Sequence, residues 1–347
     1  MKLVTFVAQS DSQSREIPGA FVPSLDASKP ARSENRVLDL TSACGAAGRS
    51  LDASSLLRLI EGGDVAHDAM REAVDLHALG KLPEKFKDRA MTHALADVSL
   101  LSPLPRPPSM RDGYAFRQHV ETARRNRGLD MIPEFDQFPV FYFTNHQAVI
   151  GPGPLHVLPR HLEKLDFELE AAIVIGKKGR NIPANRADEM IFGLTIMNDF
   201  SARTLQMDEM KLNLGPAKGK DFATALGPVI VTMDELASKT KKTPNGNQFD
   251  LTMTARLNGK ELSRGNVKDM NWTFAQIIER ASYGVTLYPG DVIGSGTCGT
   301  GCLLELNGSK ITDNLWMKPG DVIELEIEDI GKLVNEVVQG EVVAKIG

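Results

Sequence analysis

The sequence is poor in cysteine and has no long apolar run. Three cysteines, Cys44, Cys298 and Cys302, occur in 347 residues. This odd, low number argues against a disulfide framework and is typical of a reducing compartment. No uncharged apolar segment approaches the length that spans a bilayer, and the apolar run at residues 3–7 is too short for a signal peptide. The sequence therefore predicts a cytoplasmic protein without a membrane partner.

An excess of positive charge is also missing. Forty Lys and Arg residues face 45 Asp and Glu residues, which gives a net charge of −5 and a pI near 5.9. This balance does not indicate a surface for nucleic acid or anionic membranes, and we interpret the short basic stretches as solvated faces. With 42% hydrophobic and 24% charged residues, the composition is that of a globular protein with one large domain or two smaller ones.

The chain divides at a proline-rich stretch. Residues 101–108 read LSPLPRPP, which cannot form a helix and is poorly suited to a central strand. We therefore expect a small N-terminal α/β domain at residues 1–100, a connector at 101–110 and a catalytic domain at 111–347. In the first domain the patterns predict strands at 2–8 and 36–40, a long polar loop at 9–36, and helices at 51–60 and 66–79.

The second domain is predicted to be mainly β. Strands are expected at 139–143, 165–176, 192–199, 228–233, 251–257 and in most of the chain after 285. A helix is expected at 201–210, with Ser201 as its N-cap, and another at 272–281. Helices are too few for a doubly wound sheet, so the predicted fold class is α+β.

Two glycine-rich segments imitate nucleotide-binding motifs. Residues 294–299 match Gly-x-Gly-x-x-Gly, but that fingerprint requires a following helix, and residues 302–306 read as a strand. Residues 215–221 are one residue short of a P-loop and carry Asp221 where Ser or Thr should stand. We reject both motifs and interpret Cys298 and Cys302 as packing residues.

Paired carboxylates carry the strongest chemical signal. On a strand, Glu168 and Glu170 would point to the same face, and the apolar run 171–175 indicates a buried strand. Two buried carboxylates need a cation, for which a hard divalent metal is suited. The alternative is an edge strand with a solvated acidic face. Asp112, His119 and Asp199, each unremarkable alone, would add further ligands and a candidate base.

At this point the segment from Arg111 to Leu333 resembles the fumarylacetoacetate hydrolase family. The resemblance covers about two-thirds of the chain, while the first hundred residues match only in general character and residues 9–36 look like an insertion. It rests on six motifs: RD at 111–112 with RQH at 117–119, LDFELE at 165–170, MNDFSARTLQ at 197–206, GKDF at 219–222, PGD at 289–291 with GSGT at 294–297, and Glu305.

The resemblance implies a fumarylacetoacetate hydrolase-like mixed β-roll catalytic domain, a homodimer, and a bound Mg²⁺, or Ca²⁺ or Mn²⁺. Arg124, Arg125 and Arg127 lie near the arginine with which the family hydrolase binds its substrate carboxylate, but none stands at the same offset; Arg127 is taken as the candidate, and the choice among the three stays open. By resemblance, the metal ligands are Asp112, Glu168, Glu170 and Asp199, the base is His119 oriented by Glu305, the charge-stabilising residues are Arg203, Gln206 and Lys220, and the substrate contacts are Tyr142, Thr297 and Arg127.

These residue types suit hydrolysis of a C–C bond in a β-diketone acid. Such a reaction needs a metal that polarises the diketone and a base that activates water, and histidine ordinarily exchanges protons near neutral pH. We therefore expect a hydrolase of fumarylacetoacetate-like or acylpyruvate acids in aromatic catabolism, with a small anionic diketo acid as substrate. One alternative is a 2-oxo acid decarboxylase, tautomerase or hydratase with the same metal site, and a second is a non-catalytic metal-stabilised binding protein. The pair His119 and Glu305 favours hydrolysis over decarboxylation, which needs no activated water.

Overall fold

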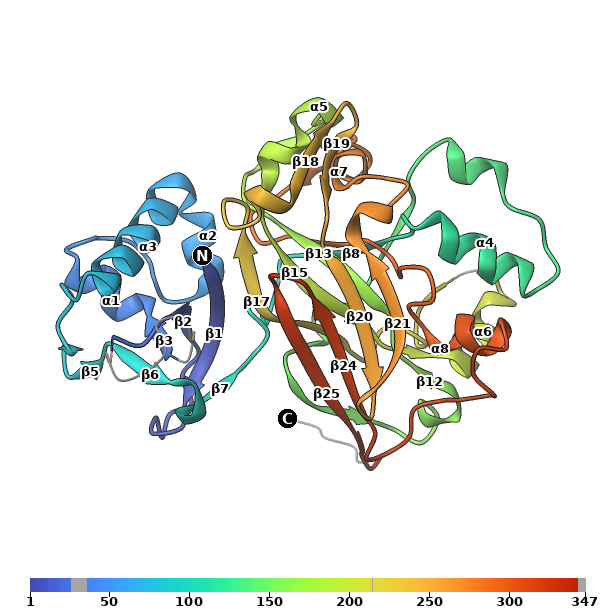
Figure 1. Cartoon of the computed structure of the whole chain (residues 1–347), viewed down its shortest axis with the longest axis horizontal. Coiled ribbons are helices and arrows are strands. Elements are labelled where there is room, and N and C mark those ends of the chain that lie inside the picture. Colours follow the sequence, from blue (N-terminus) through green and yellow to red (C-terminus); the bar gives the residue numbers. More distant parts are fainter. Residues whose placement is uncertain (26–35, 214, 343–347) are drawn as a thin grey trace.

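The computed structural model describes residues 1–25, 36–213 and 215–342. Figure 1 shows the N-terminal hundred residues as an α/β unit on one side of a larger, β-rich body. Residues 26–35, part of the predicted polar loop, lie outside the described ranges. None of the helices within the described ranges is long and apolar enough to cross a bilayer.

The N-terminal unit packs three helices against a small antiparallel sheet. Its strands pair in the order β6-β3-β2-β1, and β7 pairs with β1. Apolar side chains of α1, α2 and α3 are buried against the sheet in one cluster with Leu3 and Leu38. The elements are β1 (Lys2–Ala8), β2 (Ile17–Val22), β3 (Arg36–Asp39), α1 (Leu40–Ala46), α2 (Leu56–Glu61), α3 (Gly63–Ala78), β4 (Lys85–Phe86), β5 (Arg89–Ala90), β6 (Thr92–Ala94) and β7 (Val98–Leu100).

The predictions for this unit are partly confirmed. Strands β1 and β3 and helix α3 stand where the sequence patterns placed them. The predicted loop at 9–36 is wrong in one part, because it contains β2, which pairs with both β1 and β3. The helix predicted at 51–60 begins only at Leu56, where Ser55 accepts a hydrogen bond from the Arg58 N–H. Helix α1 was missed.

One sheet joins the N-terminal unit to the rest of the chain. Strand β1 pairs with β17, where Leu3 stands opposite Ile230. From there the order continues β17-β15-β13-β23-β8-β9, which makes a sheet of 12 strands among the described residues. The added strands are β8 (Met110–Gly113), β9 (Phe141–Phe143), β10 (Val149–Ile150), β13 (Leu169–Ile175), β15 (Ile191–Asp199), β17 (Thr224–Thr232) and β23 (Val292–Gly294).

A second sheet covers the first. Along β24 the residues alternate between buried and partly exposed, so that Ile323, Leu325 and Ile327 face inward. They share one apolar core with Ile173 and Ile196 of the first sheet. The order is β11-β25-β24-β20-β21, formed by β11 (Gly153–Val157), β20 (Thr252–Leu257), β21 (Lys260–Asn266), β24 (Val322–Ile327) and β25 (Gly331–Gln339). The mainly β α+β class is confirmed.

Three helices gather at one end of the two sheets, on the right of Figure 1. They are α4 (Arg117–Arg125), α6 (Arg203–Met210) and α8 (Leu303–Gly308). The remaining elements are the short strands β12 (Leu165–Asp166), β14 (Gly179–Arg180), β16 (Ser201–Ala202) and β22 (Thr286–Leu287), the helices α5 (Ala184–Ala187) and α7 (Phe274–Ser282), and the hairpin of β18 (Thr240–Thr243) and β19 (Gly246–Phe249).

Two predictions near these helices are wrong. Residues 302–306 are not a strand, because α8 begins at Leu303. The Gly-x-Gly-x-x-Gly segment at 294–299 was rejected because no helix was expected after it, and this reason is wrong. The helix that follows has only six residues, and three residues separate it from Gly299. Ser201 is not a helix N-cap: its hydroxyl donates to the Asp199 carbonyl oxygen at 3.0 Å, and α6 starts at Arg203 without a side-chain cap.

Candidate active site

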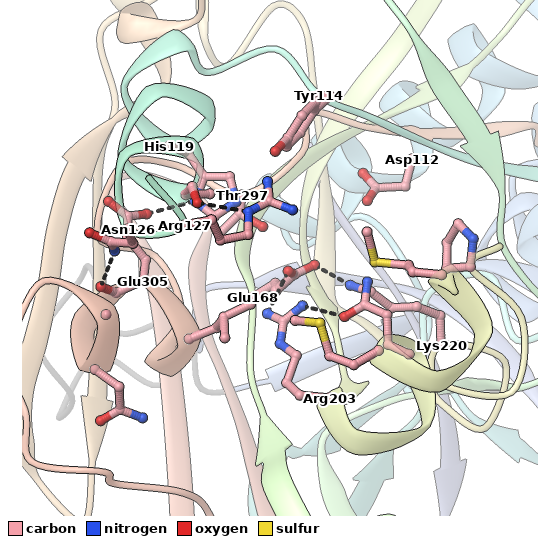
Figure 2. Close-up of a pocket in the computed structure, with 18 of the residues that line it drawn as sticks. Asp112, Tyr114, His119, Asn126, Arg127, Glu168, Arg203, Lys220, Thr297 and Glu305 are labelled. Atoms are coloured by element: carbon pink, nitrogen blue, oxygen red, sulfur yellow. Dashed lines mark hydrogen bonds and ion pairs between the residues drawn. The ribbon is translucent and has the colours of Figure 1, made fainter. Parts of the chain in front are cut away.

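A cavity of about 1190 Å³ lies where α4, α6 and α8 meet the end of the large sheet. Figure 2 shows side chains from β8, α4, α6 and α8 pointing into it from several sides. The predicted site residues that line it are Asp112, His119, Arg127, Tyr142, Glu168, Arg203, Gln206, Lys220, Thr297 and Glu305.

Three buried carboxylates converge at its floor. Asp112, Glu168 and Asp199 each offer an oxygen atom within 4.8 Å of the other two. Strand pairing brings them together: β8 runs parallel to β23 with Asp112 opposite Gly294, and β13 pairs with β15, which ends at Asp199. Gly294 is required here, because a Cβ atom would lie 2.5 Å from Oδ1 of Asp112. The sequence had indicated all three carboxylates.

Glu168 does not stand on the same strand as Glu170, as the sequence had suggested. Strand β12 ends at Asp166 and β13 begins at Leu169, so Glu168 lies in the link between them. Its backbone N–H donates to Oδ1 of Asn198 at 2.9 Å, which holds the link against β15. The pairing keeps one register across this link, with Asp166 opposite Ser201 and Leu169 opposite Asn198, so Glu168 stands opposite Asp199. Glu170 lies beside Asp112 and outside the three-oxygen group.

The carboxylates carry more negative charge than their surroundings balance. Burial and the charge of Asp199 raise the pKa of Asp112 to about 7. Burial and the neighbouring Asp112 raise the pKa of Glu170 well above its ordinary value. Among the described residues, Oε2 of Glu170 and Oδ1 of Asp199 are buried without a hydrogen-bond partner. All the donors are hard oxygen atoms, so the set fits a divalent cation such as Mg²⁺ or Ca²⁺.

Two buried cations flank this cluster, and Figure 2 shows both beside Glu168. The Lys220 ammonium contacts Oε2 of Glu168 and lies 2.9 Å from Oδ2 of Asp199. Arg203 donates to Oε1 of Glu168 at 2.8 Å. Burial alone would raise the pKa of Glu168, but the charges of Lys220 and Arg203 outweigh it and lower that pKa to about 2.

Arg203 is hydrogen-bonded to three neighbouring side chains. Besides Glu168, its guanidinium donates to Oδ2 of Asp166 at 2.8 Å and to Oε1 of Gln206 at 3.0 Å. Its side chain is buried between these partners, so it orients Glu168 and Gln206. Gln206 lines the cavity, and because its oxygen accepts from Arg203, its amide nitrogen can donate to a ligand there.

Asp166 is a positioning residue that the sequence did not single out. It is fully buried, and its carboxylate accepts hydrogen bonds from the N–H groups of Leu303 at 2.7 Å and Leu304 at 3.0 Å. It thereby satisfies the first N–H groups of α8 and holds Arg203 at the same time. Its partners lie 37 and 137 residues along the chain, so no local pattern could have indicated this role.

The predicted acid–base pair is assembled across the cavity from the carboxylates. Nδ1 of His119, on α4, lies 2.6 Å from Oε2 of Glu305, on α8. Both side chains are buried, and the ring of Tyr114 stands edge-on to the imidazole with centroids 5.9 Å apart. Since an ionised carboxylate can only accept, Nδ1 donates to Glu305 and Nε2 is the nitrogen free to accept a proton.

Cys298 and Cys302 are both buried, as their packing role predicted.

The three predicted substrate contacts occupy different positions. The Tyr142 hydroxyl donates to Asp199, and Oγ1 of Thr297 lies 3.4 Å from Oε1 of Glu170, so both also support the carboxylate cluster. Arg127 is exposed just beyond α4, and only its Nε is bonded among the described residues, to the Ala123 carbonyl at 3.0 Å. Figure 2 shows its guanidinium directed toward the cavity near Thr297.

The arrangement therefore joins a carboxylate cluster for a cation, a histidine with a free ring nitrogen, and hydrogen-bond donors around one cavity. Such a site can polarise a carbonyl group and move a proton next to it.

Comparison with known proteins identifies the family. Residues 109–338 match the family model described as fumarylacetoacetate (FAA) hydrolase C-terminal. Oxaloacetate tautomerase YisK of Bacillus subtilis (strain 168) is 30% identical over 292 residues, covering 82% of this chain and 86% of that protein. The mitochondrial oxaloacetate tautomerase FAHD2A of Homo sapiens is 33% identical over 245 residues, 70% of each chain. The fumarylacetoacetate hydrolase structure from Exiguobacterium antarcticum superposes with a TM-score of 0.65 at 26% identity, covering 98% of this chain and all of that one. The chain belongs to the fumarylacetoacetate hydrolase family.

Proposed function

We propose that this protein is a metal-dependent hydrolase of acylpyruvates. It cleaves the C–C bond between the acyl carbonyl carbon and the methylene carbon. The observation that carries the proposal is the 2.6 Å contact between His119 and Glu305 on the wall of the cavity that also contains the carboxylate cluster. A carboxylate behind a histidine fixes its tautomer and stabilises its protonated form, which is what a base that activates water requires.

Asp112, Glu168, Glu170 and Asp199 would hold the divalent ion that enzymes of this family use. The chemistry such an ion would supply when bound is Lewis-acid polarisation of a substrate carbonyl group. Water loses a proton to Nε2 of His119 and its oxygen attacks the acyl carbonyl carbon. The C–C bond then breaks, its electron pair passes to the pyruvate enolate, and the proton held by His119 returns to the methylene carbon. The products are pyruvate and a carboxylic acid, which keeps the second proton of the water and releases it to solvent at neutral pH.

The remaining polar groups suit the charge that develops in this reaction. Lys220 lies next to the cluster, and its ammonium has one proton more than its two carboxylate partners use. The amide nitrogen of Gln206 is oriented by Arg203 and faces the same space. Both can donate to an oxyanion in a buried site, where such donors contribute most. Arg127, with its terminal nitrogens unbonded among the described residues, is the candidate partner for the pyruvate carboxylate.

A second candidate function is the enol–keto tautomerisation of oxaloacetate. It is favoured by the names of the relatives from Bacillus subtilis and Homo sapiens, both oxaloacetate tautomerases. The same histidine could move a proton between carbon and oxygen without adding water.

Isotope-labelled water separates the two. The protein is incubated with Mg²⁺ and acetylpyruvate in ¹⁸O-water, and the products are analysed by mass spectrometry. Hydrolysis places one solvent oxygen in the newly formed acetate. In a parallel assay, the ultraviolet absorbance of enol-oxaloacetate is followed. Rapid decay of that absorbance, with no acetate formed from acetylpyruvate, would reject the hydrolase in favour of the tautomerase.

A further inference from the structure

The cavity is much larger than the chemistry at its floor requires. Its volume of about 1190 Å³ exceeds the usual range of about 300–1,000 Å³ for pockets that enclose drug-sized ligands. The carboxylate cluster lies on one side of it, and His119 with Glu305 lies on the other (Figure 2). A four-carbon acid placed on the carboxylate cluster would leave most of the cavity filled with water. The substrate therefore has a part that extends away from the cluster.

Part of the cavity wall is apolar, beside polar lining residues that include Lys310 and Asp313. Met207 and Met210 stand one turn apart on α6, with exposed fractions of 38% and 46%. Ile311, just after α8, lines the same cavity and is 61% exposed, and Leu304 and Val140 add to the apolar lining. Exposed apolar side chains scattered singly need no explanation. Here several belong to one cavity that is continuous with the reacting groups, so a ligand in the site would cover them.

The position of the methionines decides which part of the substrate they contact. Met207 follows Gln206 directly on α6, whereas Arg127, the candidate for the carboxylate, comes from the segment after α4. Figure 2 shows Arg203 and Arg127 on separate sides of the cavity. A diketone bound at the cluster with its carboxylate toward Arg127 directs its acyl part toward α6. Methionine is unbranched and adapts its shape, so this wall suits a flexible chain or a ring better than a short polar group.

We propose that the substrate is an acylpyruvate with an extended apolar acyl arm, of about five or more carbons, which packs against Met207, Met210 and Ile311. This inference rests on the proposed function for the reaction but adds the class of acyl group. Burying one methylene contributes about 0.8 kcal/mol, which corresponds to a factor of about four in binding. Selectivity should therefore rise steeply with chain length until the arm fills the cavity.

The test compares acetylpyruvate, butanoylpyruvate and hexanoylpyruvate with Mg²⁺ present. We expect kcat/KM to rise more than tenfold from the first to the last. In Met207→Gln/Met210→Gln the ratio between hexanoylpyruvate and acetylpyruvate should fall at least fivefold. The matched control is Leu212→Gln, because Leu212 is 80% exposed on the segment after α6 but does not line the cavity. A flat dependence on chain length in the unaltered protein, or the same ratio in the double variant, would overturn the inference.

A binding measurement tests the apolar arm independently of the proposed reaction. Dissociation constants of the magnesium-loaded protein are measured by calorimetry for pyruvate, 2-oxohexanoate and 2-oxooctanoate, which need no turnover. Tighter binding with length, lost in the double variant, supports the apolar arm even if no acylpyruvate is hydrolysed, and in that case only the proposed function fails. Equal dissociation constants along the series reject the arm. Conversion of a dimer to a monomer by the double variant would instead assign the methionines to a contact between two copies of the chain.

Discussion

The ammonium of Lys220 lies 2.9 Å from Oδ2 of Asp199 and also contacts Glu168, so one buried cation holds two of the three converging carboxylates. Asp221, the next residue in the sequence, is not the partner of Lys220. Asp221 pairs with Lys218 instead, which lies 2.9 Å from it at the surface. The contrast between two neighbouring lysines supplies a controlled experiment.

Lys220→Met should lower turnover at least about 100-fold, because it removes a cation that complements the developing oxyanion. In chelator it should also destabilise the protein by about 3–5 kcal/mol, since Glu168 and Asp199 lose their buried partner. Affinity for Mg²⁺ should be kept. Lys218→Met is the control and should stay within threefold of the unaltered protein in kcat. Similar turnover in the two variants would remove Lys220 from the site.

Removing divalent metal should lower both activity and thermal stability. An ion that binds only the folded protein stabilises it by about 2.7 kcal/mol at a concentration one hundred times its dissociation constant. We therefore expect a chelator to lower the melting temperature and abolish turnover, and Mg²⁺ or Mn²⁺ to restore both. Asp199→Asn should make the melting temperature insensitive to chelator and metal. Full activity in the chelated protein would show that the carboxylate cluster holds no functional ion.

The stability of the metal-free protein should fall as the pH rises from 5 to 7. The pKa of Asp112 is raised to about 7 in the folded protein, from an ordinary value of 3.8. The folded state therefore binds this proton more tightly than the unfolded state, and the resulting stabilisation is complete below about pH 4 and lost as the pH passes 7. The loss from Asp112 is at most about 4 kcal/mol.

Chemical denaturation in chelator at several pH values measures this effect. Asp112→Asn should show a shallower decline between pH 5 and 7 than the unaltered protein, whereas Asp313→Asn, on the rim of the same cavity, should not. The pKa of Glu170 is raised as well, so some decline of stability with pH should remain in Asp112→Asn. An identical slope in Asp112→Asn and the unaltered protein contradicts the assignment.

The acid–base pair should behave as one unit. His119→Asn should reduce hydrolysis about 10²- to 10⁴-fold, the usual contribution of a general base. Glu305→Gln should reduce it less, because it weakens the orientation and charge of the histidine without removing it. The double variant should be close to His119→Asn alone. Magnesium affinity, measured by calorimetry, should be unchanged in all three variants, because neither residue belongs to the carboxylate cluster. If the rate losses of the two single variants multiply in the double variant, His119 and Glu305 act independently and not as a pair.

Local pattern was sufficient for the strands that are buried on both faces and for the carboxylates at their ends. Strand β15 and its terminal Asp199 were predicted because a mainly apolar run, broken only by Thr195, ends at two polar residues. Helix α8 was not predicted, because its short run of leucines fits a strand equally well. What makes it helical is Asp166, which accepts two of its first N–H groups from 137 and 138 residues away.

The break between β12 and β13 at Glu168 escaped prediction for the same reason. Alternation through residues 165–170 is compatible with one continuous strand, and nothing nearby in the chain shows where it breaks. The break is fixed by Asn198, whose side chain accepts the Glu168 N–H. The site residues could be identified through their motifs, but their mutual contacts depend on partners that are distant in the sequence.

The pairing of β1 with β17 bears on how the chain tolerates truncation. Strand β17 is buried along its whole length, and β1 covers the part of its edge around Ile230 and Val231. A protein cut at the proline-rich connector would leave that part of an apolar strand with open backbone groups, which is the feature that recruits other chains. We expect residues 101–347 expressed alone to aggregate, and co-expression of residues 1–100 as a separate polypeptide to rescue them by adding the missing strand in trans.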